Sequence, residues 1–264
     1  MEQRKNPFIE KGDQFVRTGT LWVGTSNIAI PGAKHTFPEA YRSTTRLTYH
    51  GALFNSLEVN STFYTVPQGK TVARWAAEVP DNFRITLKVH QGITHQKQLQ
   101  YSDSDIIRFV DVANNIGSKK GCLLVQFPGS INIDYRAKVE HILAVLHDAD
   151  ADNAWSKAIE FRHPSWYNRY TEDLLDKYGM ALVIHDIPKS KILEPNAKAP
   201  FVYWRFHGEA GDYKGSYDIA VLNDYAARIS DWMKSGRDVY VYFNNTIGDA
   251  FENARTLRAL IEKK

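Results

Sequence analysis

The sequence predicts a single-domain α/β protein of the (β/α)8 barrel class, and three observations support this. The chain has 264 residues, which exceeds the usual length of one domain but matches the roughly 250 residues of such a barrel. Short apolar runs alternate with longer segments of helical spacing, which is typical of a parallel sheet. No linker of shifted composition divides the chain. We therefore expect an N-terminal extension over residues 1–20 and one barrel domain over residues 21–264.

Eight segments have the short length and the apolar, β-branched or aromatic content of strands. One of them opens with the apolar run Cys122-Leu123-Leu124-Val125, which indicates a strand buried on both faces. In chain order the expected strands are 21–25, 56–60, 84–89, 122–127, 157–162, 181–184, 201–207 and 239–243.

The segments between these strands have the apolar spacing of amphipathic helices. Acidic residues follow Ser102 and Thr171, which is typical of the first turn of a helix. The link between the sixth and seventh strands carries three prolines and predicts a loop or a short helix. The expected helices are 44–54, 69–78, 103–116, 135–147, 171–178, 219–234 and 250–262.

A doubly wound open sheet is the alternative fold. Such a sheet normally has a glycine-rich G-x-G-x-x-G turn after its first strand. This chain has Gly24-Thr25-Ser26-Asn27 at that place, which is a poor match. The regular βα alternation therefore favours a closed barrel.

The composition indicates a soluble globular protein with a sizeable core. Hydrophobic residues make up 43% of the chain and charged residues 24%. The formal charge of +3 is too mild to predict nucleic acid as the main partner. No apolar run is long enough for a membrane span and the N-terminus lacks a signal-peptide core, so we expect a cytoplasmic protein without a membrane partner. The single cysteine, Cys122, excludes an intramolecular disulfide, and its apolar setting predicts a buried, unreactive thiol.

Side-chain alternation along the strands places polar residues inside the barrel. In the second expected strand Leu57 and Val59 face the helices, which leaves Glu58 and Asn60 inside. Unpaired charges cannot lie in the apolar layer between strands and helices. We therefore expect the charged and polar residues of the other strands to point into the barrel as well. The deeper inward residues are Glu58, Lys88, Gln126, Glu160, Arg205 and Tyr242, and those nearer the C-terminal ends are Asn60, His90, Arg162, His207 and Asn244.

This inward set indicates a site for a small anion at the C-terminal face of the barrel, where the active sites of this fold lie. Three fixed cations face two carboxylates, and arginine forks suit a carboxylate or phosphate. A glutamate among cations is ionised and can act as a base, while histidines can relay protons. We therefore expect hydrolase-like acid–base chemistry. The expected catalytic residues are Glu58, Glu160 and His207, and the expected substrate-binding residues are Asn60, Lys88, His90, Gln126, Arg162, Arg205 and Asn244.

Several alternatives stay open. Glu58 is on the strand next to Lys88, and Glu160 lies near Arg162 and within reach of Arg205. These ions can form a structural plug, although buried ion pairs stabilise a fold poorly. The barrel can also be a non-catalytic anion sensor or carrier. Acceptable metal ligands are present, namely Glu58, Glu160, His185, Asp186 and His207. However, no H-x-x-x-H or H-E-x-x-H spacing occurs and the cations would repel a metal, so we expect neither metal nor cofactor. Lys88 beside other cations can form a Schiff base, while Glu58 opposes the lowered pKa that this needs.

Two further points concern the ends of the strands. Parity does not settle the sixth strand, where either His185 or Asp186 turns inward. Phe63 and Tyr64 directly follow the second strand, where they can wall a pocket or pack within a loop.

The highly specific run E-F-R-H-P-S-W at 160–166, together with several shorter motifs, resembles the signature of the YecE-like family, the domain of unknown function 72. The resemblance covers about residues 21–260. It implies a TIM barrel, in agreement with the strand count, and implies no activity or substrate. The other matching motifs are E-V-N-S-T-F-Y at 58–64, T-V-A-R-W at 71–75, Lys88 followed by I-T-H at 93–95, Q-F-P at 126–128, R-F-H-G at 205–208, and Y-F-N-N at 242–245 followed by Asn253 and Ala254.

The chain departs from the family pattern in two places. The family usually has G-T-S-G with an aromatic residue after the first strand, whereas this chain continues from Ser26 into Asn27 and Ile28. This difference removes an expected aromatic platform from the first loop. The family often has A-D-x-P after the sixth strand, and here His185 replaces the alanine.

Overall fold

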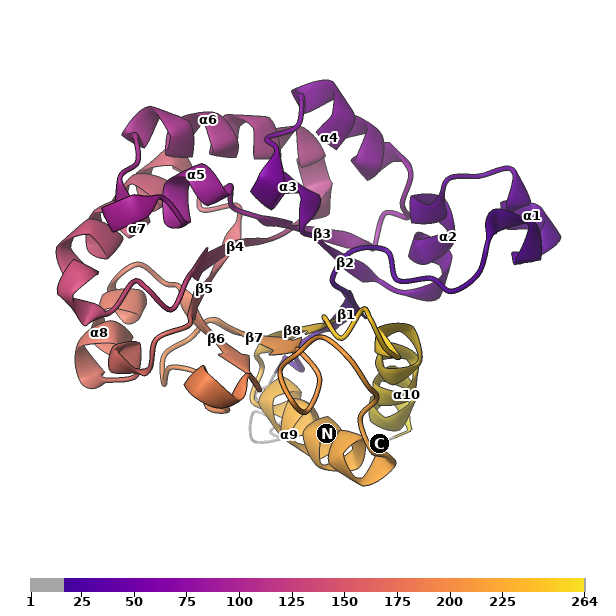
Figure 1. Ribbon diagram of the computed structural model, residues 1–264. Helices are drawn as coiled ribbons and strands as arrows, with labels where there is room; N and C mark the ends of the chain where they lie inside the picture. Colours follow the sequence, from indigo (N-terminus) through magenta and orange to yellow (C-terminus); the bar gives the residue numbers. More distant parts are fainter. Residues whose placement is uncertain (1–16, 264) are drawn as a thin grey trace, which may run out of the picture.

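Eight parallel strands form a nearly closed barrel in the computed structural model, which describes residues 17–263 (Figure 1). Consecutive strands are neighbours around the barrel from β2 to β8, and β8 pairs with β1. The expected barrel fold is therefore confirmed, and each strand begins and ends within two residues of its expected range. The strands are β1 (Leu21–Thr25), β2 (Ser56–Val59), β3 (Arg84–Lys88), β4 (Lys120–Phe127), β5 (Ser156–Phe161), β6 (Ala181–His185), β7 (Phe201–Phe206) and β8 (Asp238–Phe243).

The seam between β1 and β2 is closed by a few contacts rather than by a full ladder. Asn55 bridges the two strands, because its side chain accepts from Val23 N at 2.9 Å and donates to Leu21 O at 2.7 Å. Further along, Asn27 N donates to Glu58 O at 2.7 Å. A Cβ atom on Gly24 would lie only 2.0 Å from Ser56 O, so this close approach of the two backbones requires glycine.

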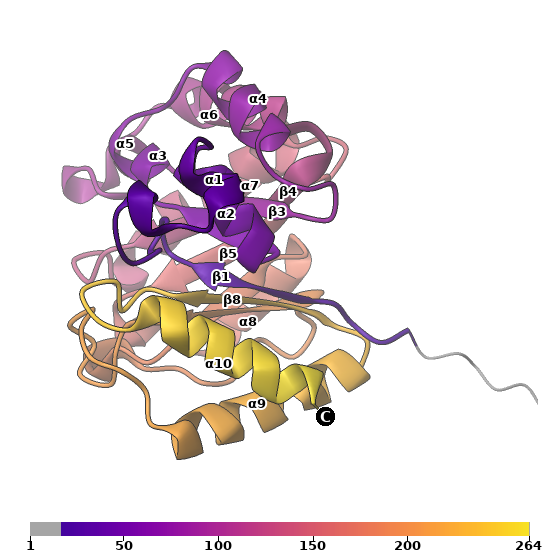
Figure 2. The same ribbon diagram turned by 90° about the vertical axis from the view of Figure 1, so that its right-hand side faces the viewer.

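Seven helices surround the barrel at the places where the sequence predicts them (Figure 1). Figure 2 shows the last two lying side by side across β8 and β1. As expected, the link between β6 and β7 holds only a 3-10 turn, Pro188–Ser190. The helices are α2 (Arg46–Leu53), α4 (Gly69–Ala77), α6 (Asp103–Ala113), α7 (Arg136–Ala149), α8 (Arg169–Lys177), α9 (Ile219–Lys234) and α10 (Ala250–Glu262).

Three helices of one turn each were not expected. α1 (Glu39–Arg42) lies outside the ring of helices (Figure 1), while α3 (Ser61–Tyr64) and α5 (Gln91–Thr94) follow β2 and β3 directly. They are too short to carry a helical periodicity, so the sequence pattern does not show them. The expected extension at residues 1–20 lies mostly outside the described residues. Within residues 17–263, no helix is both long enough and apolar enough to cross a membrane.

The barrel interior changes character along its axis. Its lower part is an apolar layer that includes Cys122, Leu124, Tyr203 and Tyr240, all buried. Cys122 is completely buried, and burial raises the pKa of its thiol well above the usual value. The expected burial of this thiol is therefore confirmed, and its low reactivity stays a prediction. The charged side chains lie above this apolar layer.

Candidate functional site

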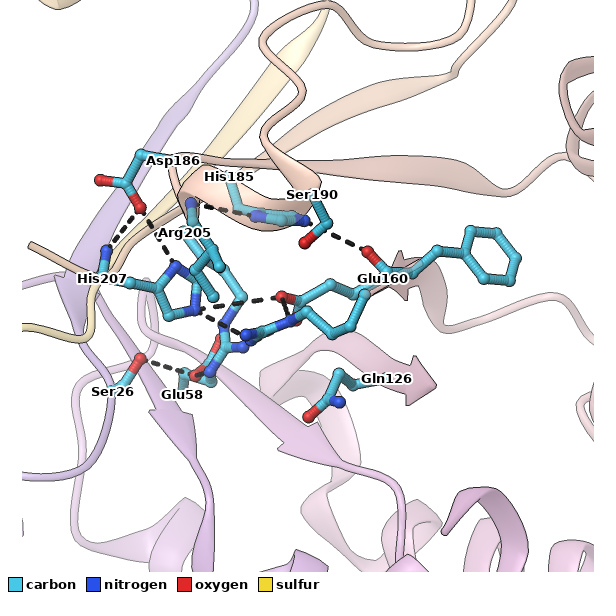
Figure 3. A network of polar contacts seen from close by, with 12 residues as sticks. Ser26, Glu58, Gln126, Glu160, His185, Asp186, Ser190, Arg205 and His207 are labelled. Atoms are coloured by element: carbon cyan, nitrogen blue, oxygen red, sulfur yellow. Dashed lines mark hydrogen bonds and ion pairs between the residues drawn. The ribbon is translucent and has the colours of Figure 1, made fainter. Parts of the chain in front are cut away.

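Arg205 on β7 lies at the centre of the charged cluster, between two glutamates (Figure 3). Its guanidinium donates to both carboxylate oxygens of Glu58, with Nε 3.0 Å from Oε2 and Nη2 2.8 Å from Oε1. Its remaining nitrogen, Nη1, donates to Glu160 Oε2 at 2.7 Å. All three side chains are at most 1% exposed. The predicted interior positions of these residues are therefore confirmed.

The carboxylate of Glu58 is fully occupied by donors. Besides Arg205, Tyr203 Oη donates to Oε2 at 2.6 Å and Ser26 Oγ donates to Oε1 at 2.6 Å. Burial would raise the pKa of Glu58, but the charge of Arg205 and the hydrogen bonds to the carboxylate outweigh burial and hold the pKa below its usual value. Glu58 is thus ionised, and its oxygens already have four donors.

Glu160 at the end of β5 holds a second arginine. Arg162 Nε lies 2.6 Å from Glu160 Oε1 in an ion pair, although its N–H does not point along the line to that oxygen. Burial would raise the pKa of Glu160, but Arg162 and Arg205 hold it well below its usual range. Glu160 is therefore ionised and shared between the two arginines.

His207 lies between Asp186 (Figure 3) and the guanidinium of Arg162. His207 Nε2 lies 3.1 Å from Arg162 Nη2, and its Nδ1 lies 3.3 Å from Asp186 Oδ1. Burial lowers the pKa of His207 to about 4, so the ring is neutral at pH 7. Because an arginine N–H can only donate, Nε2 accepts and Nδ1 carries the hydrogen that faces Asp186. Tyr217 Oη donates to the second oxygen of Asp186.

Lys88, the last residue of β3, contacts neutral side chains, and no carboxylate in the described part of the chain pairs with it. Its Nζ donates to Gln126 Oε1 at 2.8 Å and lies 4.1 Å from the centre of the Phe63 ring. Gln126 Nε2 in turn lies 3.3 Å from His95 Nε2. Burial, together with the charge of Arg205, lowers the pKa of Lys88 to about 8.

A pocket of about 200 Å³ lies above this cluster, at the C-terminal ends of the strands. Three cations line it, while the buried Glu58 and Glu160 lie outside its lining. Asn60 Oδ1 is buried and has no hydrogen-bond partner among the described residues. The lining residues are Asn27, Asn60, Phe63, Tyr64, Lys88, Gln126, Arg162, Arg205, Tyr213 and Asn244.

Six of the seven expected substrate-binding residues therefore line one pocket. The exception is His90, whose Nδ1 accepts from Gly92 N at 3.1 Å and caps α5. The expected catalytic residues lie beside or beneath the pocket, with Glu58, Glu160 and His207 all completely buried. Their contacts place them around the two arginines.

The structure shows the surroundings of His185 and Asp186, whose directions at the end of the sixth strand the sequence left open. Asp186 takes part in the cluster through His207, whereas His185 Nε2 lies 3.2 Å from both Tyr167 Oη and Phe161 O. Burial lowers the pKa of His185, which keeps this ring neutral. Asp186 follows the last strand residue, so strand alternation could not assign its direction.

Several site residues lie in segments where the sequence has no regular period. Ser26, Asn27 and Tyr213 lie in loops, and His95 follows the one-turn helix α5. Their polar side chains near strand ends were the available signal, and the family motifs already contain Ser26 and His95. Within residues 17–263, no three His, Cys, Asp or Glu side chains form a group that could hold a metal ion.

A family model described as "Protein of unknown function DUF72" matches residues 22–264. The chain belongs to the DUF72 family. Two named relatives are the UPF0759 protein YecE of Escherichia coli K12, 25% identical over 160 residues, and the UPF0759 protein YunF of Bacillus subtilis 168, 23% identical over 263 residues. The match to YecE covers 59% of this chain and 57% of YecE, and the match to YunF covers 86% and 90%.

Solved structures of DUF72 proteins share this fold. One from Enterococcus faecalis V583 is 25% identical with a TM-score of 0.75, and the match covers 92% of this chain and 98% of that one. Another, from Thermotoga maritima MSB8, is 24% identical with a TM-score of 0.73 and covers 92% and 99%. The expected family and fold are thus confirmed, while neither description names an activity.

Proposed function

We propose that this DUF72 protein is an enzyme that binds a small anionic substrate at the C-terminal face of its barrel. The observation that carries the proposal is the lining of the pocket: three cations and several amides face it, but no carboxylate of residues 17–263 does. A low-dielectric pocket with this excess of positive charge favours an anion. Its volume of about 200 Å³ is below that of typical drug-sized sites, which favours a substrate of a few carbon atoms.

Arg162 is the group best placed to bind the anion. Its side chain is 15% exposed, whereas Arg205 is 1% exposed and each of its three nitrogens already donates to a glutamate. Glu160 and His207 hold the Arg162 guanidinium in place, which reduces the entropy lost when a ligand binds. Asn60, Gln126 and Asn244 supply amide groups that can orient the rest of the substrate.

The contacts favour a positioning role for Glu58, Glu160 and His207 in place of direct acid–base catalysis. Each of these groups is occupied by an arginine, and none lines the pocket. Lys88 lines the pocket with a pKa lowered to about 8, so it is the titratable group best suited to proton transfer near pH 7. Hydrolysis of a phosphate- or carboxylate-bearing substrate remains part of the proposal.

The test measures anion binding by calorimetry for the parent, Arg162→Gln and Arg108→Gln. Arg108 is exposed on α6 and provides the matched loss of one surface arginine. Inorganic phosphate, small carboxylates and sugar phosphates are the probes. We expect Arg162→Gln to weaken binding at least about tenfold, since a charge-assisted hydrogen bond contributes about 1.5–3 kcal/mol, and Arg108→Gln to bind like the parent.

Two results would contradict the proposal. The first is the absence of binding by every anion, and the second is equal affinity in Arg162→Gln and the parent. A non-catalytic sensor or carrier is distinguished by following each bound compound by NMR, because an enzyme converts at least one of them and a carrier returns all of them unchanged.

A further inference from the structure

Lys88 differs from the other cations of the site in its immediate surroundings. Arg205 and Arg162 each contact a buried glutamate, whereas no carboxylate within residues 17–263 forms an ion pair with Lys88. Its ammonium group contacts the face of Phe63 and the amide oxygen of Gln126. The backbone is held as well, since Thr62 Oγ1 donates to Lys88 O at 2.7 Å.

This setting favours the uncharged amine. Desolvation penalises the ammonium form, and the positive charges of Arg205 and Arg162 add to that effect, while the glutamates oppose it from behind the arginines. An amine with a pKa of about 8 is roughly one quarter neutral at pH 7.5, against about one part in a thousand for an ordinary lysine. The pocket therefore presents a nucleophilic nitrogen beside an anion-binding arginine.

We propose that Lys88 forms a Schiff base with a small aldehyde or ketone that carries a carboxylate or phosphate group. This inference rests on the proposed function, in which Arg162 binds the anionic group. Both side chains line the same pocket of about 200 Å³, so an anion held by Arg162 places a carbonyl carbon of a small substrate within the space that Lys88 also faces.

The reaction balances without an oxidant or a reductant. The lone pair of Nζ forms a bond to the carbonyl carbon, and an amine proton moves to the carbonyl oxygen to give a carbinolamine. The hydroxyl group then takes up a proton and leaves as water, which gives a protonated imine. Loss of the last Nζ proton returns the proton that was taken up, so that one carbonyl and one amine become one imine and one water. The imine draws electrons from the neighbouring carbon, which is the use of a Schiff base in breaking or forming bonds there.

The experiment traps the imine by reduction. The parent protein is incubated with glyoxylate, an aldehyde with a carboxylate, or with glycolaldehyde, a neutral aldehyde of similar size, in the presence of cyanoborohydride. Intact mass gives the number of adducts, and peptide mapping gives their positions. We expect glyoxylate to modify Lys88 at least about tenfold faster than any surface lysine, because its neutral fraction is larger.

Three variants serve as controls. Lys88→Met removes the expected adduct, while Lys70→Met removes an exposed lysine of α4 and leaves the adduct in place. Arg162→Gln should slow modification by glyoxylate about tenfold and leave modification by glycolaldehyde close to the parent rate. Circular dichroism of each variant shows whether it is folded before labelling.

The outcomes separate the two proposals. Anion binding without modification of Lys88 refutes the Schiff base and leaves the proposed function intact. Equal rates with glyoxylate and glycolaldehyde, or no effect of Arg162→Gln, refute the anionic carbonyl substrate. If no anion binds and Lys88 is not modified, both proposals fail together.

Discussion

Replacement of Arg205 by methionine tests whether the buried ion cluster holds the barrel mouth together. The substitution removes three hydrogen bonds of 2.7–3.0 Å and leaves two completely buried carboxylates without this partner. Glu160 keeps Arg162, but Glu58 keeps only the neutral donors Tyr203 and Ser26. Removing one partner of a buried ion pair costs about 3–5 kcal/mol, which corresponds to a fall in Tm of about 10 °C for a protein of this size.

The difference in Tm between Arg205→Met and the parent should depend on pH, and its direction follows from the pKa values of the two glutamates. In the parent, the pKa values of Glu58 and Glu160 are lowered, so their contribution to stability is complete above pH 4.5 and is lost as the pH falls through the lowered values. In Arg205→Met, burial of Glu58 is no longer opposed by the arginine, and its pKa rises. Protonation then relieves the buried charge, so the difference in Tm between variant and parent should narrow as the pH falls from 7 toward 5.

Scanning calorimetry at several pH values measures both effects. The double variant Arg205→Met with Glu58→Gln removes the unpaired charge and should be more stable at pH 7 than the single variant. Arg108→Met, on the exposed face of α6, controls for the loss of a surface cation and should change Tm by less than about 2 °C. The reasoning is refuted if Arg205→Met unfolds within about 2 °C of the parent, or if the difference in Tm is independent of pH.

Two further predictions concern the barrel wall. Gly24→Ala places a Cβ atom 2.0 Å from Ser56 O, so β1 and β2 must separate. Overpacking of this kind costs about 1–3 kcal/mol of folding free energy, and we therefore expect the Tm to fall by several degrees. An unchanged Tm would contradict the close approach of the two strands. The thiol of Cys122 is completely buried with a raised pKa, so Ellman's reagent should react with it only when denaturant unfolds the protein, and rapid reaction of the native protein would show that the interior is accessible.

The fold and the inward residues could be predicted because both depend on strict periods. A strand in a parallel barrel is buried on both faces, so one charged residue between two apolar ones fixes the direction of every side chain in that strand. Glu58 between Leu57 and Val59 is such a case, and the structure confirms its position. The same reasoning stops where the strand stops, which is why His90 turned out to cap a short helix and why His185 and Asp186 could not be told apart.

Strand parity predicted only part of the charge pairing. The expected proximity of Glu160 to Arg162 and Arg205 is confirmed. The sequence also places Glu58 next to Lys88 on a neighbouring strand, which suggests an ion pair between them. In the structure Glu58 pairs with Arg205, which reaches it from β7. The reason is geometric: side chains at the same height in a narrow barrel meet near its axis, so a long arginine on a distant strand competes with neighbours along the wall.

The pairing decides where the excess charge of the site lies. The sequence shows three inward cations and two carboxylates, a surplus of one positive charge with no assigned place. In the structure the two arginines share the two glutamates, with Arg205 bridging both and Arg162 bound to Glu160. This arrangement leaves the surplus positive charge on Lys88. Its ammonium group contacts Phe63 and Gln126, and the side chain lines the pocket. One buried framework therefore fixes Arg162 at the pocket and leaves Lys88 without an ion pair to any carboxylate of residues 17–263. These are the two features on which the proposed chemistry of a small anionic carbonyl compound depends.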